Sequence, residues 1–148
     1  MKTLMNTMIL AVLLTVSTVA AQAQVKTITF DQLPKAAQNM INKYYDAKNV
    51  SYVTEESEFM KSKEYEVRFH DGVEVEFDAK GDWKEVDGKK KPVPVALIPT
   101  SIASHVKKSF PNNEVVKISR SSRKYEVELS NGLDLEFDKQ GKFLRIDD

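Results

Sequence analysis

A regular alternation of apolar and charged residues is the clearest pattern in the chain. Tyr65, Val67 and Phe69 are separated by charged residues, and residues 73–77 resume the same alternation. A period of two gives a strand with one apolar and one charged face, as strands of antiparallel sheets have. We therefore predict two neighbouring strands over this stretch.

Turns that contain glycine separate the predicted strands. Asp71-Gly72 is a pair typical of a two-residue hairpin turn, because both residues tolerate positive φ. A second turn, at residues 78–82, returns the chain into a further strand over 83–87. Together with an earlier strand around Val50 to Thr54, these segments predict a four-stranded antiparallel meander.

A helical spacing of apolar residues precedes the meander. Ala37, Met40, Ile41 and Tyr44 fall at i, i+3, i+4 and i+7, which places them on one face of a helix. Pro34 suits the first turn of that helix, where a missing N–H leaves no intrahelical hydrogen bond unmade. A second predicted helix begins near Pro99, and its apolar stripe consists of Ile98, Ile102, Val106 and Phe110.

The two halves of the chain are related in sequence. Residues 65–87 and 125–147 share nine of 23 positions at one fixed offset of 60. Upstream of this stretch the offset is 65, so the first copy carries a five-residue excess within residues 55–64. We therefore predict two copies of one supersecondary unit. Matched pairs include Pro34 with Pro99, Tyr65 with Tyr125, Gly72 with Gly132, Phe77 with Phe137 and Gly81 with Gly141.

The predicted fold class is α+β. Each unit consists of one helix and a four-stranded antiparallel meander, with the first unit at residues 24–87 and the second at 98–148. The linker 88–97, rich in lysine and proline, is expected to be extended and not helical. Side by side, the units would form a sheet of about eight strands with both helices on one face, leaving the other face charged and solvated.

The first 23 residues have the pattern of a secretory signal peptide. Lys2 precedes a continuous apolar run from Met8 to Leu14, and Ala21-Gln22-Ala23 offers small residues at the positions that a signal peptidase recognises. The apolar run is shorter than a membrane span needs. We therefore expect export, cleavage after Ala23 and a periplasmic or secreted protein without membrane insertion.

Composition excludes several function classes. The chain has 22 basic and 22 acidic residues, and a nucleic-acid-binding protein would normally show a basic excess. It has no cysteine, which excludes a disulfide scaffold and a thiolate zinc site. Its two histidines leave little room for a histidine metal cluster.

Several motifs resemble those of the PepSY-like family, the β-lactamase-inhibitor-like periplasmic proteins of Bacteroidetes. They are Leu33-Pro34-x-x-Ala37, Val93-Pro94-x-x-Leu97-Ile98-Pro99, Tyr125-Glu126-Val127-x-Leu129-x-Asn131-Gly132 and Phe137-Asp138-x-x-Gly141. The resemblance implies an architecture similar to the β-lactamase inhibitory protein, and a secreted or periplasmic binding or inhibitory role. PepSY domains are thought to restrain peptidases.

No catalytic constellation is apparent in the sequence. A hydrolase needs a nucleophile beside a base, or convergent carboxylates in a pocket. His70 precedes a tight turn and corresponds to Ser130 in the second copy, so we interpret it as an exposed turn residue. His105 lies beside the apolar stripe of the second helix and is expected to be partly buried. We therefore predict a protein that is not an enzyme and needs no cofactor.

Acidic residues at the second turn raise the question of calcium. Asp78, Asp82 and Asp87 place several carboxylates in and around one glycine-containing turn. However, Lys80 lies inside this segment, and its spacing differs from that of a calcium-binding loop. The simpler interpretation is a hairpin turn whose aspartate accepts hydrogen bonds from its own backbone. Calcium stays a secondary hypothesis.

Differences between the two copies suggest where a partner binds. Tyr52 corresponds to Lys117 and should point away from the helices, near Glu66, Arg68 and Glu74. The segment Glu55–Lys63, which contains the excess, is expected to project as a loop beside the open sheet face. Phe59 and Met60 in that loop are further candidates, and packing within the loop is the alternative to a binding patch of Tyr52, Phe59 and Met60. Trp83 is a candidate to a lesser extent, because it aligns with Phe143 and burial in the core is the simpler interpretation.

Two hypotheses of function follow. The first is an exported binding module that recognises a protein or peptide, with inhibition or regulation of an envelope protein such as a peptidase or β-lactamase as one form of this role. The second is a structural or sensory envelope protein that binds a small ligand or calcium.

Overall fold

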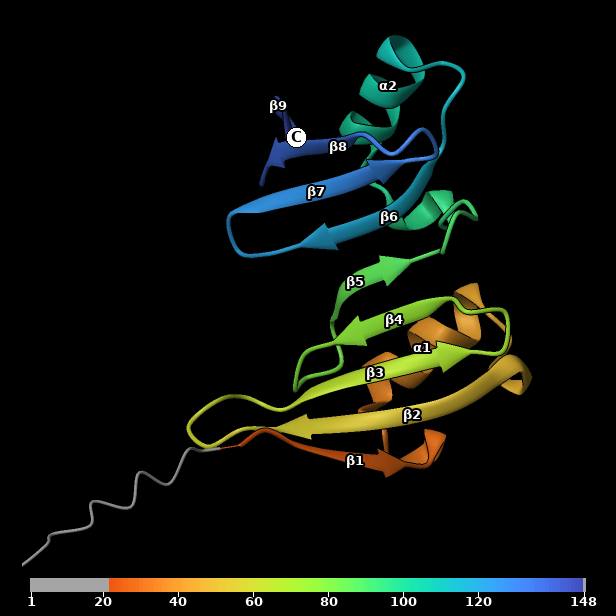
Figure 1. Cartoon of the computed structure of the whole chain (residues 1–148), viewed down its shortest axis with the longest axis vertical. Helices are drawn as coiled ribbons and strands as arrows, with labels where there is room; N and C mark the ends of the chain where they lie inside the picture. The colour runs from red at the N-terminus through yellow and green to blue at the C-terminus, as the bar shows by residue number, and fades with distance from the viewer. Residues whose placement is uncertain (1–21, 148) are drawn as a thin grey trace, which may run out of the picture.

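The strands of the computed structural model, which describes residues 22–147, follow one another across one antiparallel sheet in chain order (Figure 1). The helices are α1 (Lys35–Tyr44) and α2 (Thr100–Ser109), with short 3-10 turns at Phe30–Gln32, Ala47–Asn49 and Val95–Leu97. The strands are β1 (Gln24–Ile28), β2 (Val50–Ser57), β3 (Glu64–Phe69), β4 (Glu74–Phe77), β5 (Trp83–Asp87), β6 (Val115–Arg120), β7 (Lys124–Leu129), β8 (Asp134–Asp138) and β9 (Phe143–Asp147).

The sheet has nine strands, one more than the eight expected from the sequence. The additional strand is β1, which pairs antiparallel with β2 from Gln24↔Ser57 to Ile28↔Val53. At this edge only Ile28 of the strand is buried, so β1 lacks the alternation that identified the other strands. After β1, the order of one α-helix and four strands occurs twice, as α1 with β2–β5 and α2 with β6–β9.

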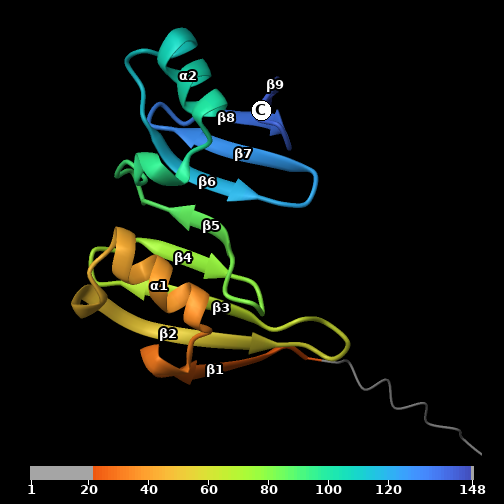
Figure 2. The same cartoon turned by 180° about the vertical axis from the view of Figure 1, so that it is seen from behind.

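Both α-helices pack on the same face of the sheet, behind it in Figure 1 and in front of it in Figure 2. The apolar stripe of α1 accounts for this, because Ala37 and Ile41 are fully buried. On α2, Ile102 and Val106 are buried against the same face of the sheet. Neither helix of the described range has the length and apolar character needed to cross a membrane.

The core lies between the helices and the apolar face of the sheet. Phe77 and Phe137 are completely buried and pair across the sheet with Tyr65 and Tyr125, respectively. The pair Tyr65 and Phe77 in the first half of the sheet is therefore equivalent to the pair Tyr125 and Phe137 in the second half. Burial of such aromatic side chains is a large part of the hydrophobic stabilisation of a small sheet.

The hairpin turns differ in detail from the prediction. The Phe69 N–H donates to the Val73 carbonyl at 2.9 Å, which leaves three residues in the loop instead of two. Gly72 has φ 92°, whereas Asp71 is not among the non-glycine residues with positive φ. This is the type I turn with a glycine bulge, and the Asp71 carboxylate supports it by accepting a hydrogen bond from the Val73 N–H. Residues 129–133 form the same turn around Gly132.

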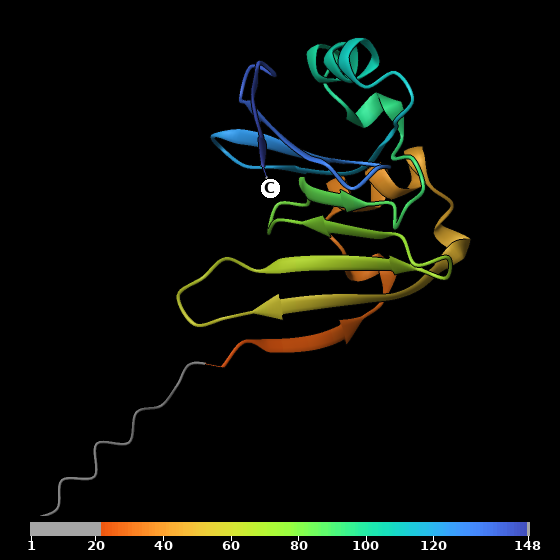
Figure 3. The same ribbon diagram turned by 45° about the horizontal axis from the view of Figure 1, so that its top comes forward.

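Two further expectations need correction. The linker is not fully extended, because Val95–Leu97 form a 3-10 turn that buries Leu97. The five-residue excess of the first half is only partly a loop, since β2 continues to Ser57 and the loop proper is 58–63. The β2–β3 hairpin therefore extends beyond its neighbours instead of folding beside the sheet (Figures 1 and 3).

The two halves join along a short seam between β5 and β6. These strands pair over three residues, Glu85↔Ser119, Val86↔Ile118 and Asp87↔Lys117. Figure 3 shows how strongly the sheet twists across this junction. Because the pairing stops at Glu85, the ends of the strands at Trp83 and Arg120 are not joined by the ladder.

Candidate binding surface

The face of the sheet opposite the helices is uncovered in the described part of the chain (Figure 1). Inward residues of the central strands are buried, as Val67 and Val75 show, and the residues between them are partly exposed. The alternation therefore creates one large polar surface, the open face, as the sequence predicts.

Acidic side chains outnumber basic ones on the open face, although the whole chain has no net charge. The pattern follows from the register, which aligns glutamates of neighbouring strands, as in Glu66↔Glu76↔Glu85. The acidic residues at outward positions are Glu56, Glu64, Glu66, Glu74, Glu76, Glu85, Asp87, Glu126, Glu128, Asp134, Glu136, Asp138 and Asp147. The basic residues there are Arg68, Lys84, Lys117, Lys124 and Arg145.

Tyr52 lies on the open face, as predicted, and is 40% exposed. It pairs across the strands with Arg68, whose guanidinium carbon is 5.7 Å from the centre of the tyrosine ring. Arg68 also forms ion pairs with Glu74 and, at 3.3 Å, with Glu66. The structure thus brings four of the predicted binding residues into one cluster, in which the arginine holds an exposed aromatic ring among carboxylates.

Phe59 and Met60 are at the tip of the β2–β3 hairpin and are 77% and 91% exposed. Met60 has φ 62°, a conformation that side chains other than glycine adopt rarely. Tyr52 is five residues before the end of β2, which is ~17 Å along an extended strand. The tip and the Tyr52 cluster are therefore separate parts of the surface, and not one contiguous patch.

Trp83 is on the helix side of the sheet. It pairs with the core residue Phe77 and is half-buried. The guanidinium of Arg120 stacks over the indole, with its carbon 3.8 Å from the ring centre. Trp83 therefore contributes to neither the Tyr52 cluster nor the open face, and the alternative of packing against the core describes it better.

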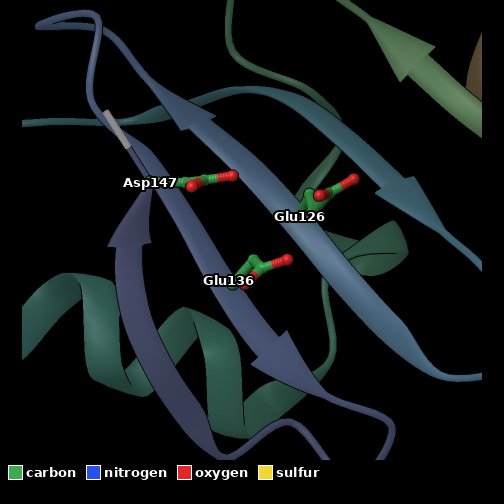
Figure 4. A group of neighbouring side chains, drawn as sticks. All are labelled: Glu126, Glu136 and Asp147. Atoms are coloured by element: carbon green, nitrogen blue, oxygen red, sulfur yellow. The ribbon is translucent and has the colours of Figure 1, made fainter.

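A group of three carboxylates lies at the C-terminal end of the open face (Figure 4). Glu126, Glu136 and Asp147 come from β7, β8 and β9, and one oxygen of each lies within 4.8 Å of the others. They border a hollow of about 330 Å³. Strand alternation alone places Glu126 and Glu136 on this face, but the approach of Asp147 depends on the register of β8 and β9.

The sequence predicts that residues of this face are solvated, but Glu136 is buried. Its side chain is 6% exposed, because the side chains of Lys124 and Arg145 cover it. Arg145 Nε is 2.7 Å from the carboxylate, and Lys124 Nζ also contacts it. The hydrogen bond from Lys124, together with the charge of Arg145, holds the pKa of Glu136 below its ordinary value.

Glu76 occupies the corresponding position in the first half and has the opposite environment. Burial is the main cause that raises the pKa of its carboxyl, and the negative charges of Glu85 and Glu66 add to the effect. The charge of Lys84 opposes it only in part. The two halves of the open face therefore differ in how well their acidic residues are compensated.

The remaining polar residues behave as the simpler interpretations predict. His70 is exposed in a turn, and His105 is half-buried with its ring stacked on Phe143 at 4.4 Å between centroids. One carboxylate oxygen of Asp78 accepts hydrogen bonds from the Lys80 and Asp82 N–H groups. This carboxylate therefore stabilises the turn. The three carboxylates that gather in the described residues are those in Figure 4, and not the aspartates of this turn.

The open-faced antiparallel sheet with two helices on its other side defines a small α+β protein with the architecture of a binding module. A family model described as "putative beta-lactamase-inhibitor-like, PepSY-like" matches residues 63–145. The chain belongs to this PepSY-like family. No curated protein matches the chain.

Solved structures of Bacteroides proteins are similar over most of the chain. A protein of Bacteroides thetaiotaomicron, described as a "putative calcium-regulated periplasmic protein", is 42% identical, with a TM-score of 0.80 over 84% of this chain and 97% of that one. A periplasmic protein of the DUF2874 family from Bacteroides vulgatus is 38% identical, with a TM-score of 0.79 over 84% and 97%. A second from the same species, of unknown function, is 37% identical, with a TM-score of 0.78 over 86% and 100%.

Proposed function

We propose that this protein is exported to the periplasm and binds a protein partner through the open face, without catalysing a reaction. The periplasmic origin of similar proteins supports the location, and so does the leader pattern at residues 1–23, most of which lies outside the described residues. The related halves of the chain are consistent with two copies of one unit that together build this surface.

The acidic excess on an uncovered nine-stranded face carries the proposal. Charged surfaces of this kind steer association and select partners of complementary charge. A partner with a basic surface, or an extended basic peptide, is therefore the class that fits. Tyr52 adds an amphipathic ring at the centre of a charged cluster, and aromatic residues are enriched at the cores of interfaces.

An inhibitory or regulatory role is the form of binding that the family suggests. Its description as β-lactamase-inhibitor-like makes envelope hydrolases, including peptidases and β-lactamases, the first partners to test. The open face would act by covering the partner's own binding surface. Nothing in this mode of action requires a cofactor.

The experiment isolates partners from envelope extracts with purified residues 24–148 and then measures the affinity for each partner at increasing salt. The test variant is Glu56→Lys/Glu128→Lys/Asp134→Lys, at outward positions that form no ion pair among the described residues. The control variant is Lys107→Glu/Lys108→Glu on the exposed side of α2.

We expect the open-face variant to lose affinity and the α2 variant to keep it, with binding that weakens as salt rises. A partner that is itself a hydrolase should also be less active when the protein is bound. Equal binding by both variants would place the interface elsewhere and overturn the proposal.

Calcium binding is the second candidate function. The observation that favours it is the group Glu126, Glu136 and Asp147, together with a similar protein described as calcium-regulated. Calcium is held by carboxylate, carbonyl and water oxygens. Lys124 and Arg145 compete for the same carboxylate, so a bound ion would have to displace Lys124 from Glu136.

A titration with calcium, followed through the melting temperature, tests this candidate. Binding should raise the melting temperature of the wild type. Asp147→Asn should abolish the increase, whereas Asp87→Asn, which changes the corresponding aspartate of the first half, should not. No increase at millimolar calcium would eliminate the candidate.

A further inference from the structure

A second concave surface lies on the helix side of the molecule, at the seam between the two halves. It is a cleft of about 430 Å³ between α1 and the start of α2, a volume typical of sites for small ligands. The residues that line it are mostly aromatic or aliphatic: Met40, Tyr44, Trp83, Ile98, Pro99 and Tyr125, with Arg120 as the charged member. Trp83 and Arg120 line this cleft just beyond Glu85 and Ser119, the pair at which the β5–β6 ladder ends.

Arg120 departs from the pattern of its strand. It pairs with Tyr125, which in turn pairs with the core residue Phe137, so this position of β6 belongs to the apolar face. The preceding inward residue, Ile118, is fully buried. A charged side chain at such a position breaks the rule that the rest of the strand follows, and such departures concentrate at functional sites.

Arg120 is held in a defined orientation. Its Nε–H donates a hydrogen bond of 2.7 Å to the carbonyl oxygen of Trp83, which the β5–β6 ladder leaves free. Its guanidinium lies 3.8 Å from the centre of the Trp83 ring. A guanidinium that is stacked and anchored at Nε presents its remaining N–H groups as a fixed fork, which matches the two oxygens of a carboxylate.

No carboxylate occupies this fork among the residues that the structure describes. Arg120 is an exception among the cationic residues of β5–β9. The other four, which include Lys117 and Lys124, form ion pairs, whereas Arg120 forms none with the described residues. The cleft itself has no acidic residue. Asp78 and Asp82 border a neighbouring hollow with Arg120, and Asp78 already accepts two hydrogen bonds from its turn.

We propose that this cleft binds the C-terminal residue of a peptide or protein that ends in an apolar or aromatic residue. The terminal carboxylate pairs with Arg120, and the last side chain packs against Trp83 and Tyr125. The cation and the aromatic surface are in direct contact, so a ligand must carry its anion and its apolar group on neighbouring atoms. A C-terminal residue does so, because one Cα bears both.

An internal Asp or Glu fits less well. Its apolar neighbour is on a different residue, so the anion and the apolar group are farther apart than in a C-terminal residue, and the chain has to continue on both sides of the cleft. The proposal is independent of the proposed function, since the cleft and the open face are on opposite sides of the sheet. Failure of one leaves the other unaffected.

Trp83 is the single tryptophan of the chain, so its fluorescence reports directly on the cleft. The probes are the peptide acids acetyl-Gly-Gly-Phe and acetyl-Gly-Gly-Leu, compared with the same peptides as C-terminal amides. We expect the acids to change the fluorescence in a saturable manner and to bind about tenfold or more tightly than the amides, because the charge-assisted pair is lost in the amide. Equal binding of acid and amide, or no change with either peptide up to several millimolar, would overturn the proposal.

Variants assign the effect to Arg120. Arg120→Gln keeps an N–H donor for the Trp83 carbonyl but removes the charge, and it should lower the affinity for the acid to that for the amide. Arg120→Lys keeps the charge but not the fork, and it should bind the acid with intermediate affinity. Arg123→Gln, an exposed arginine of the same hairpin, is the matched control and should bind as the wild type does. Loss of affinity in Arg123→Gln equal to that in Arg120→Gln would contradict the assignment.

A last probe distinguishes the source of the carboxylate. Acetyl-Gly-Glu-Phe-Gly amide carries an internal glutamate beside an aromatic residue and has no free terminus. We expect it to bind as weakly as the amide probes. Binding as tight as that of the acids would show that the cleft recognises acidic side chains and would overturn the assignment to a C-terminus.

Discussion

Glu76 and Glu136 each lie opposite a glutamate of the preceding strand, yet their environments shift their pKa values in opposite directions. Glu136 has Lys124 and Arg145 against its carboxylate. Glu76 has two further glutamates as neighbours and only Lys84 to oppose them. The charged carboxylates at these equivalent positions therefore contribute to stability with opposite signs. Replacing each glutamate with uncharged glutamine tests this difference.

Glu136→Gln is expected to lower the melting temperature at neutral pH. Because the folded-state pKa is lowered, the carboxylate stabilises the fold above the ordinary pKa of 4.5, and this contribution is lost as the pH falls through the folded-state value. Melting curves between pH 7 and pH 3 should show the variant and the wild type converging at the acidic end. A constant difference over that range would show that the ion pairs are not its cause.

Glu76→Gln is expected to raise stability at neutral pH by a few tenths of a kcal/mol, since solvent screens this half-exposed group. Its raised pKa means that the folded state favours the protonated form, so stability decreases as the pH rises from the ordinary value of 4.5 through the raised one. Chemical denaturation at pH 7 and pH 4 measures the effect, which should be smaller at pH 4. Destabilisation at pH 7 would mean that a hydrogen bond of the carboxylate outweighs the repulsion.

The two core phenylalanines should be among the most sensitive positions of the chain. Phe77→Ala and Phe137→Ala each remove a fully buried ring, at a cost of about 3–5 kcal/mol. Phe59→Ala, the matched control at the exposed hairpin tip, should change the free energy of unfolding by less than about 0.5 kcal/mol. Urea denaturation compares the three, and similar effects at Phe77 and Phe59 would show that the assignment of the sheet faces is wrong.

Glycines with positive φ should differ in their tolerance of alanine. A Cβ at Gly81 would lie 2.8 Å from Pro34 Cβ and 2.9 Å from the backbone nitrogen of Ala37, whereas nothing lies within 4 Å of a Cβ at Gly132. Gly132→Ala should therefore cost only the backbone strain, about 1–2 kcal/mol. Gly81→Ala should cost clearly more, because the turn must move away from α1. Equal costs in thermal unfolding would show that the turn yields without penalty.

Much of the fold follows from local patterns, and the reason is visible in particular residues. Alternation over β3 and β4 and the stripe Ala37–Ile41 predict strands and helix correctly, because these residues face one common core. Gly72 marks a turn correctly, but its three-residue loop depends on the pairing of Phe69 with Val73. The edge strand β1 has little burial and therefore little pattern.

The candidate sites show where sequence is insufficient. Tyr52 and Arg68 could be predicted to share a face, since strand alternation alone decides it. The group of Glu126, Glu136 and Asp147 could not, because it needs the register of three strands. Nor could the cleft at Arg120, which lies beyond the last pair of the β5–β6 ladder and which combines residues of α1 with residues far away in the chain. A charged residue at an inward position of β6 was the signal that could have indicated it.

The contribution of Tyr52 to partner binding is the remaining prediction, and it follows from the position of the ring in the Arg68 cluster. Tyr52→Ala removes the exposed ring and leaves the ion pair of Arg68 with Glu74 in place. If the ring is at the centre of the interface, the loss should be about 2 kcal/mol or more, a decrease in affinity of roughly 30-fold. Val95→Ala, an exposed apolar residue of the linker, is the control and should bind normally.

Phe59→Ala separates the two parts of the surface, because the hairpin tip lies at a distance from Tyr52 along β2. A partner that covers only the centre of the open face should be sensitive to Tyr52→Ala and indifferent to Phe59→Ala. A partner that also contacts the tip should be sensitive to both, and shortening the loop 58–63 should then weaken it as well while leaving the fold intact, since surface loops tolerate changes of length at small entropic cost. Isothermal titration with the captured partner measures these affinities. Wild-type affinity in both Tyr52→Ala and Phe59→Ala would exclude an aromatic contact on this side of the sheet and leave the carboxylates of the open face as the determinants of binding.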